Sequence, residues 1–136
     1  MSNRVALSLG AFLAAIAVAL GAYAAHGLEE KILNLGYEAD LARRMQWFET
    51  GVRYNLFHAI GILCAVLITE LSDASQWFRA APTLFLIGIA LFSGSLYVMA
   101  LGPESLRWLG AIVPLGGVAM ITGWICVSCG AMASKK

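Results

Sequence analysis

The side chain best suited to chemistry is His58, which lies inside an apolar stretch. Helical spacing places Tyr54, Asn55 and His58 on one face of residues 51–71, opposite an aliphatic face. His58 falls about 10 Å along this helix from Gly51, at about 1.5 Å per residue. An imidazole can ligate haem, copper or zinc, and an ionisable group inside a membrane is a functional-site candidate by default. The simpler alternative is a neutral His58 that hydrogen-bonds to a neighbouring helix and fixes its packing.

Two hydroxyl groups further along the chain have a spacing that lets them join this polar face. Ser93 and Tyr97 lie one helical turn apart in another apolar stretch. Burying an unpaired polar group is costly, so we expect these hydroxyls to find partners across the helices. We predict one inward-facing polar cluster, made of Tyr54, Asn55, His58, Ser93 and Tyr97. His26 is expected near the same membrane edge, either as a cap of the first helix or as a second ligand beside His58.

Other patterns typical of catalysis are weak or absent in the sequence. Cys126 and Cys129 form a CxxC, but the sequence provides no second cysteine pair, histidine cluster or thioredoxin-like context. No Walker loop, GxSxG or HExxH occurs, so nucleotide hydrolysis, acyl transfer and zinc proteolysis have no support. The sequence therefore predicts a protein that is not an enzyme and has no metal site. A cofactor is expected only if His58 binds haem or a metal.

The composition indicates an integral membrane protein. Of 136 residues, 60% are hydrophobic and 12% are charged, and the mean hydropathy is +0.80. A soluble domain carries about 25% charged residues, so a soluble enzyme and a disordered tail are both excluded. Nine Lys and Arg against eight Asp and Glu provide no basic surface for nucleic acid. Three cysteines, an odd number, argue against a disulfide framework.

Four stretches are long and apolar enough for transmembrane helices, which need roughly 20 residues each. They are residues 5–25, 51–71, 80–101 and 109–131. In lipid each backbone amide must be paired within its own segment, so each stretch should be helical. We predict a single all-α domain, an integral membrane four-helix up-down bundle. The first stretch also resembles a signal peptide, but its apolar run exceeds the usual 7–15 residues and we expect a retained helix.

The first loop is the longest connection. Residues 28–35 are expected to form a short helix that ends at Gly36, and residues 37–49 an amphipathic helix on the membrane surface. Four spans place both termini on one side, which carries four basic residues against five on the other. These counts decide nothing by the positive-inside rule. The positive N-terminus and the Lys135–Lys136 tail favour both termini in the cytoplasm.

Small residues recur at helical spacing and indicate where the helices pack. Helices in lipid associate through close contact of small residues, since lipid tails are as apolar as leucine. The first span carries Gly10 and Gly21 on one stripe, and the fourth span carries Gly116, Gly117 and Gly123. We expect these glycines to face neighbouring helices.

Four segments, in order, resemble the pattern of one membrane-protein family. They are residues 21–28 (GAYAAHGL), 50–59 (TGVRYNLFHA), 92–97 (FSGSLY) and 114–117 (PLGG), the last followed by Gly123-Trp124. The chain resembles, over nearly its whole length, the family called domain of unknown function 423, which is similar to vertebrate transmembrane protein 256. The family usually has Phe and Gly where this chain has Tyr23 and Ala24. The resemblance implies four helices in a bacterial inner membrane and brings no activity, cofactor or catalytic residue.

These observations predict a small multi-pass membrane protein without catalytic chemistry. Its expected role is an accessory or assembly subunit of a larger membrane complex, or a homo-oligomer. One alternative is a module that binds haem, a metal or quinone through His58, with or without His26. A second alternative is a small channel or transporter, against which the lack of charges in three of the spans counts. The expected partners are membrane lipid and other membrane subunits, with no nucleic acid.

Overall fold

The computed structural model describes residues 1–71 and 76–133, so the Lys135–Lys136 tail lies outside the described residues. The helices of the spans are α1 (Asn3–His26), α3 (Leu41–Leu71), α4 (Gln76–Gly88), α5 (Gly94–Leu101) and α6 (Val113–Ala133). A π-helical turn, η2 (Ile89–Ser93), joins α4 and α5 into one span. Three short helices complete the order: α2 (Leu28–Asn34), η1 (Glu38–Asp40) and η3 (Glu104–Ala111). Within residues 1–71 and 76–133, four helical segments are long and apolar enough to cross a membrane, which confirms the all-α, four-span prediction.

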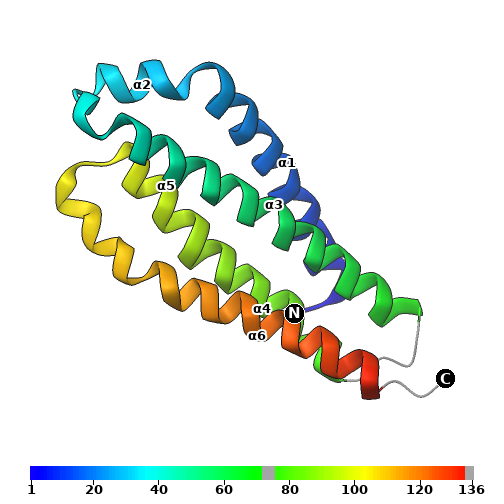
Figure 1. Cartoon of the computed structure of the whole chain (residues 1–136). Helices are drawn as coiled ribbons and strands as arrows, with labels where there is room; N and C mark the ends of the chain where they lie inside the picture. The colour runs from blue at the N-terminus through cyan, green and yellow to red at the C-terminus, as the bar shows by residue number, and fades with distance from the viewer. Residues whose placement is uncertain (72–75, 134–136) are drawn as a thin grey trace.

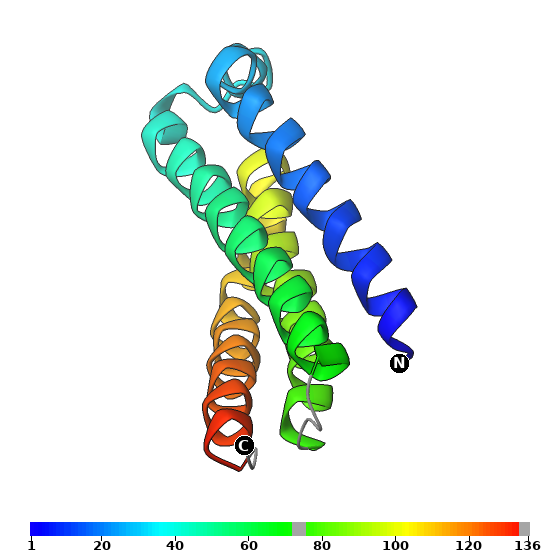
Figure 2. The ribbon, with the colours of Figure 1, turned by 90° about the vertical axis from the view of Figure 1, so that its right-hand side faces the viewer.

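The spans lie side by side rather than around a common axis (Figure 1). α1 packs along α3, α3 packs along α4 and α5, and α6 packs along α4 and η2. In the described part of the chain, α1 has extensive contacts with α3 and α2 only, and Figure 2 shows it standing apart from α6. The largest apolar cluster lies among α3, α4 and α6 and includes Ile62, Phe85 and Met120. The N-terminus and the end of α6 lie at one end of the molecule, and the short helices lie at the other.

The expectation of a separate surface helix over residues 37–49 is wrong in one respect. Residues 41–49 are helical, but they are the first turns of α3, which has 31 residues and a length of about 46 Å. The reason is packing, because Phe48 from this segment is buried with Leu28 of α2 and Ala100 of α5. The short helix that remains across the loop end is α2. Gly36, with φ of +79°, then turns the chain toward α3.

The fourth span, predicted over residues 109–131, changes its helix type near its start. Residues 109–111 belong to the 3₁₀ helix η3, and the α-helix starts at Val113. Pro114 lies in the first turn of α6, where its missing N–H leaves no helical bond unmade. Proline is over-represented in the first turn of helices, so Pro114 fits a helix start at this point.

A buried arginine fixes the loop end of the molecule. Arg44 is fully buried, and its Nη1 donates to the carbonyl oxygens of Met99 (3.1 Å), Ala100 (3.0 Å) and Gly102 (2.8 Å). Its guanidinium carbon also lies 3.5 Å from the centre of the Tyr37 ring. The last carbonyls of a helix have no partners within the helix. Arg44 therefore satisfies the end of α5 and attaches it to the start of α3.

Four of the five glycines predicted to pack lie against another helix. A methyl group at Gly10 would lie 3.0 Å from the Ile62 side chain, and one at Gly21 would lie 3.5 Å from Val52. At Gly116 it would lie 2.5 Å from the backbone nitrogen of Phe92, and at Gly123 it would lie 2.6 Å from the Phe85 ring. At Gly117 the nearest atoms are ring carbons of Phe92 at 3.9 Å. Gly117 therefore faces a more open space, described below.

Candidate functional site: a pocket between α3 and α6

The five residues of the predicted polar cluster do not come together as one group. Asn55 and Ser93 are buried where α3 meets η2 and α5, and the Asn55 Nδ2 donates to the Tyr97 hydroxyl at 3.4 Å. The Ser93 hydroxyl has no hydrogen-bond partner among the described residues. Gly51 makes this approach possible, because a methyl group there would lie 2.8 Å from the Tyr97 ring. These polar groups therefore lie in a helix interface.

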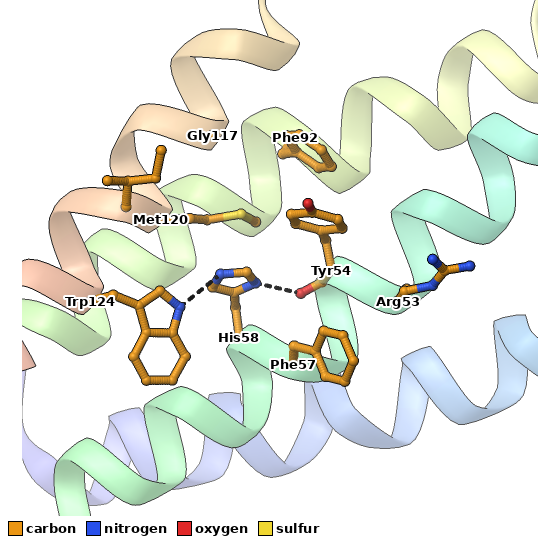
Figure 3. A pocket seen from close by; sticks show the side chains of 9 residues that line it. Arg53, Tyr54, Phe57, His58, Phe92, Gly117, Met120 and Trp124 are labelled. Carbon is orange, nitrogen blue, oxygen red and sulfur yellow. Dashed lines mark hydrogen bonds between the residues drawn. The ribbon is translucent and has the colours of Figure 1, made fainter.

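His58 and Tyr54 form a second group, directed toward α6. The His58 Nδ1 lies 2.7 Å from the Tyr54 carbonyl oxygen, and the Trp124 Nε1 donates to the His58 Nε2 at 3.2 Å (Figure 3). Positions three apart on an α-helix differ by about 300° in direction, so Asn55 and His58 diverge by about 60°. One side chain therefore faces α5, while the other reaches α6.

The hydrogen bonds of His58 define its protonation state. A carbonyl oxygen only accepts a hydrogen bond, and an indole N–H only donates one. His58 must therefore be neutral, with its proton on Nδ1 and its Nε2 lone pair directed at Trp124. Both ring nitrogens are engaged, so neither has a lone pair available for a metal without breaking a bond.

His26 lies apart from this group. It is an exposed residue in the last turn of α1, near the helix cap at Gly27, where a cation or a polar side chain is favourable. Over residues 1–71 and 76–133, no three His, Cys, Asp or Glu side chains are grouped so that they could hold a metal ion.

A pocket of about 690 Å³ opens beside His58 (Figure 3). Its walls come from α3, η2 and α6, and its lining residues are Arg53, Tyr54, Phe57, His58, Phe92, Gly117, Met120, Ile121 and Trp124. Phe57, Ile121 and Trp124 are each about half exposed, so the pocket opens sideways on the outer surface of the spans. Pockets that bind small molecules measure about 300–1,000 Å³, and this one is within that range.

Sequence reasoning missed two residues that organise these regions. Trp124 lies on the otherwise apolar α6 and provides the hydrogen bond that fixes His58. In the sequence, the indication of this role was the indole N–H of Trp124, a hydrogen-bond donor placed directly after the packing residue Gly123. Arg44 shares the stripe of Tyr37, Leu41 and Phe48 at helical spacing, which was a sign that its side chain would be buried. Nothing in the sequence signalled the π-helical turn.

Comparison with known proteins gives one consistent family. The family described as "Protein of unknown function (DUF423)" matches residues 20–117. The chain is 40% identical to the UPF0382 membrane protein YwdK of Bacillus subtilis, over 91% of this chain and 93% of that protein. It is also 40% identical to a UPF0382 membrane protein of Haemophilus influenzae, over 100% of this chain and 99% of that protein.

A third relative carries a more specific location in its name. The UPF0382 inner membrane protein YgdD of Escherichia coli K12 is 35% identical over 100% of this chain and 95% of its own length. No solved structure matches the chain. The matched residues include the pocket residues on α3, together with Phe92 and Gly117. The chain therefore belongs to the DUF423 family of membrane proteins.

Proposed function

We propose that this protein is a non-catalytic subunit of the bacterial inner membrane that self-associates through the outward face of α1. The observation that carries the proposal is that α1 has two faces of small residues, and only one of them is covered. The inner face, with Gly10 and Ala17, is buried and packs against α3. Opposite it runs an outward stripe, which consists of the exposed residues Ser8, Ala11, Ala15, Ala19, Ala22 and His26.

The spacing of this outward stripe suits contact with another helix. Ala11, Ala15 and Ala19 repeat every four residues, the small-xxx-small pattern that lets helix backbones approach closely in lipid. α1 is also an edge helix, because 17% of an apolar 18-residue stretch of this helix is buried, compared with 44% of the corresponding stretch in the span that contains α3. A lipid-facing surface has no need of small residues, so a second helix accounts for the stripe better than lipid does.

The inner-membrane location and the cytoplasmic termini are part of the proposal. Relatives named as inner membrane proteins support the location. On the loop side, Arg43 and Arg107 form ion pairs with Asp40, and Arg44 is buried. On the side of the termini, Arg4 and Arg79 are exposed. On the loop side Lys31 and Arg53 are exposed as well, so the proposed orientation rests on the basic residues beside the termini, Arg4 and the Lys135–Lys136 pair.

The two alternative functions have weaker support. Haem or metal binding at His58 would require breaking the hydrogen bond from Trp124 and moving the proton on the ring. A channel would need polar groups that line a continuous path. The buried polar groups Asn55 and Ser93 lie instead in the interface between two spans.

Disulfide crosslinking in native membranes tests the proposal. Cys64 and Cys129 are first replaced by Ala, and the buried Cys126 is kept. Ala15→Cys is then compared with Ile125→Cys, a matched position in the middle of α6 that is also exposed. We expect a crosslinked dimer from position 15 and none from position 125.

Further substitution distinguishes a specific interface from chance collision. Ala19→Leu, introduced together with Ala15→Cys, should abolish the crosslinked dimer, because the larger side chain on the same stripe separates the helix backbones. Ala131→Leu, a substitution at an exposed alanine on α6, should leave it intact. Crosslinks of equal yield at positions 15 and 125 would contradict the proposal. A crosslink from position 15 to a different protein would point to a hetero-complex through the same face.

A further inference from the structure

The pocket between α3 and α6 lies away from α1 and has no part in the proposed self-association. One end of it carries Arg53, which projects from α3 (Figure 3). The segment of α3 between Arg53 and Glu70 carries no charge. The two residues are 17 positions apart, which corresponds to about 25 Å along the helix. The hydrocarbon core of a bilayer is about 30 Å thick, so Arg53 lies close to one headgroup layer. The pocket therefore extends from the headgroup layer into the hydrocarbon.

Arg53 differs from the other loop-side arginines in having no internal partner. Arg43 and Arg107 pair with Asp40, and Arg44 bonds to backbone carbonyls. Arg53 is exposed and, within the described residues, forms no hydrogen bond or ion pair. A guanidinium at this depth is stabilised by a phosphate group, to two oxygens of which it can donate two parallel hydrogen bonds.

The rest of the pocket suits a hydrocarbon chain. Phe57, Met120 and Ile121 provide apolar walls, and Gly117 leaves space between α6 and Phe92. The His58 and Trp124 N–H groups in the wall both have acceptors, so an acyl chain beside them leaves neither donor unpaired. An acyl chain needs no hydrogen-bond partner, so it can lie along this apolar wall.

We propose that this pocket binds one anionic glycerophospholipid from the surrounding leaflet, with its phosphate at Arg53 and an acyl chain along the wall between α3 and α6. The lipid enters sideways, through the opening bordered by Phe57 and Trp124. The charge of Arg53 selects the headgroup, and the space at Gly117 accommodates the chain.

Native mass spectrometry of the full chain in detergent, titrated with lipid, tests this proposal. Phosphatidylglycerol and phosphatidylcholine with identical acyl chains are compared, and bound lipids are counted per protein. We expect one phosphatidylglycerol to bind about fivefold more tightly than phosphatidylcholine, because both carry a phosphate but the choline cation of the second lipid offsets its attraction to Arg53. Arg53→Gln should remove this preference. Arg79→Gln, an exposed arginine at the other membrane face, should retain it.

A second pair of variants tests the acyl-chain part of the site. Gly117→Leu fills the pocket and should weaken binding of both lipids about tenfold or more, whereas Val118→Leu, at an exposed neighbour, should not. Soluble glycerol 3-phosphate should not displace the lipid, because it lacks the chain. Equal binding of the two lipids, unchanged selectivity in Arg53→Gln, or unchanged affinity in Gly117→Leu would each overturn the proposal. A second copy of the chain bound at this pocket in place of lipid would also overturn it.

Discussion

A methyl group added at Gly116 should disrupt the close crossing of α6 with η2. The new Cβ would lie 2.5 Å from the Phe92 backbone nitrogen and 2.9 Å from its Cβ. The nearest atom belongs to the backbone of η2, so no side-chain rotation can relieve the contact. Gly88 crosses at the same point, since a methyl group there would lie 3.1 Å from the Gly116 carbonyl oxygen. We therefore expect α6 to separate from α4 and η2 in the Gly116→Ala variant.

The neighbouring glycine provides a matched control for the size of the effect. Alanine is favoured over glycine in a helix by at most about 1 kcal/mol, and this term applies to both positions in the first turns of α6. At Gly117 the added methyl group meets only ring carbons at 3.9 Å, an ordinary contact. Overpacking typically costs about 1–3 kcal/mol. The free energy of unfolding should thus be about 1–3 kcal/mol lower for Gly116→Ala than for Gly117→Ala.

The assay is unfolding of the purified protein in mixed micelles by SDS titration, followed by tryptophan fluorescence. Gly117→Ala should unfold at the SDS fraction of the parent or slightly above it, and Gly116→Ala clearly below it. Equal midpoints for the two variants would refute the crossing of α6 over η2 at this residue.

Three further perturbations follow from named contacts. Arg44→Met should lower the free energy of unfolding by about 1–3 kcal/mol, because the carbonyl groups at the end of α5 lose their hydrogen-bond donor. In the same SDS titration, Arg43→Met, which removes an exposed ion pair, should change this free energy by less than about 1 kcal/mol. His58→Phe removes two hydrogen bonds and should lower the free energy of unfolding by about 1 kcal/mol, which is more than Trp124→Phe, which removes one. If the His58→Phe variant is as stable as the parent, the hydrogen bonds of His58 contribute nothing to stability. A green fluorescent protein fused to the C-terminus should fluoresce and an alkaline phosphatase fused there should be inactive, and the opposite result would place the termini outside the cytoplasm.

Much of the fold could be predicted because lipid restricts the choice of backbone structure. Four apolar stretches can only be helices in a membrane, and the turn at Gly36 follows from the position of that glycine after a short helix. The error over residues 37–49 arose from treating amphipathicity as evidence for membrane-surface location. The apolar stripe there is real, but it faces α2 and α5 rather than lipid.

The site was less accessible to sequence reasoning because it depends on which helices become neighbours. Helical spacing groups Tyr54, Asn55 and His58, yet the packing directs Asn55 toward α5 and His58 toward α6. The π-helical turn at η2 adds to the difficulty, since it changes the register between Phe85 and Ser93 and no residue type signals it. Such a turn becomes visible only once the contact with α6 is known.

Self-association through α1 can be measured directly as the number of copies per particle in a lipid bilayer. Single-molecule photobleaching of the labelled full chain, reconstituted at low density, counts the subunits that move together. Self-association through α1 predicts two or more bleaching steps for the parent and one step for Ala15→Leu. A single bleaching step for the parent at every density tested would show that the protein is a monomer and would contradict self-association.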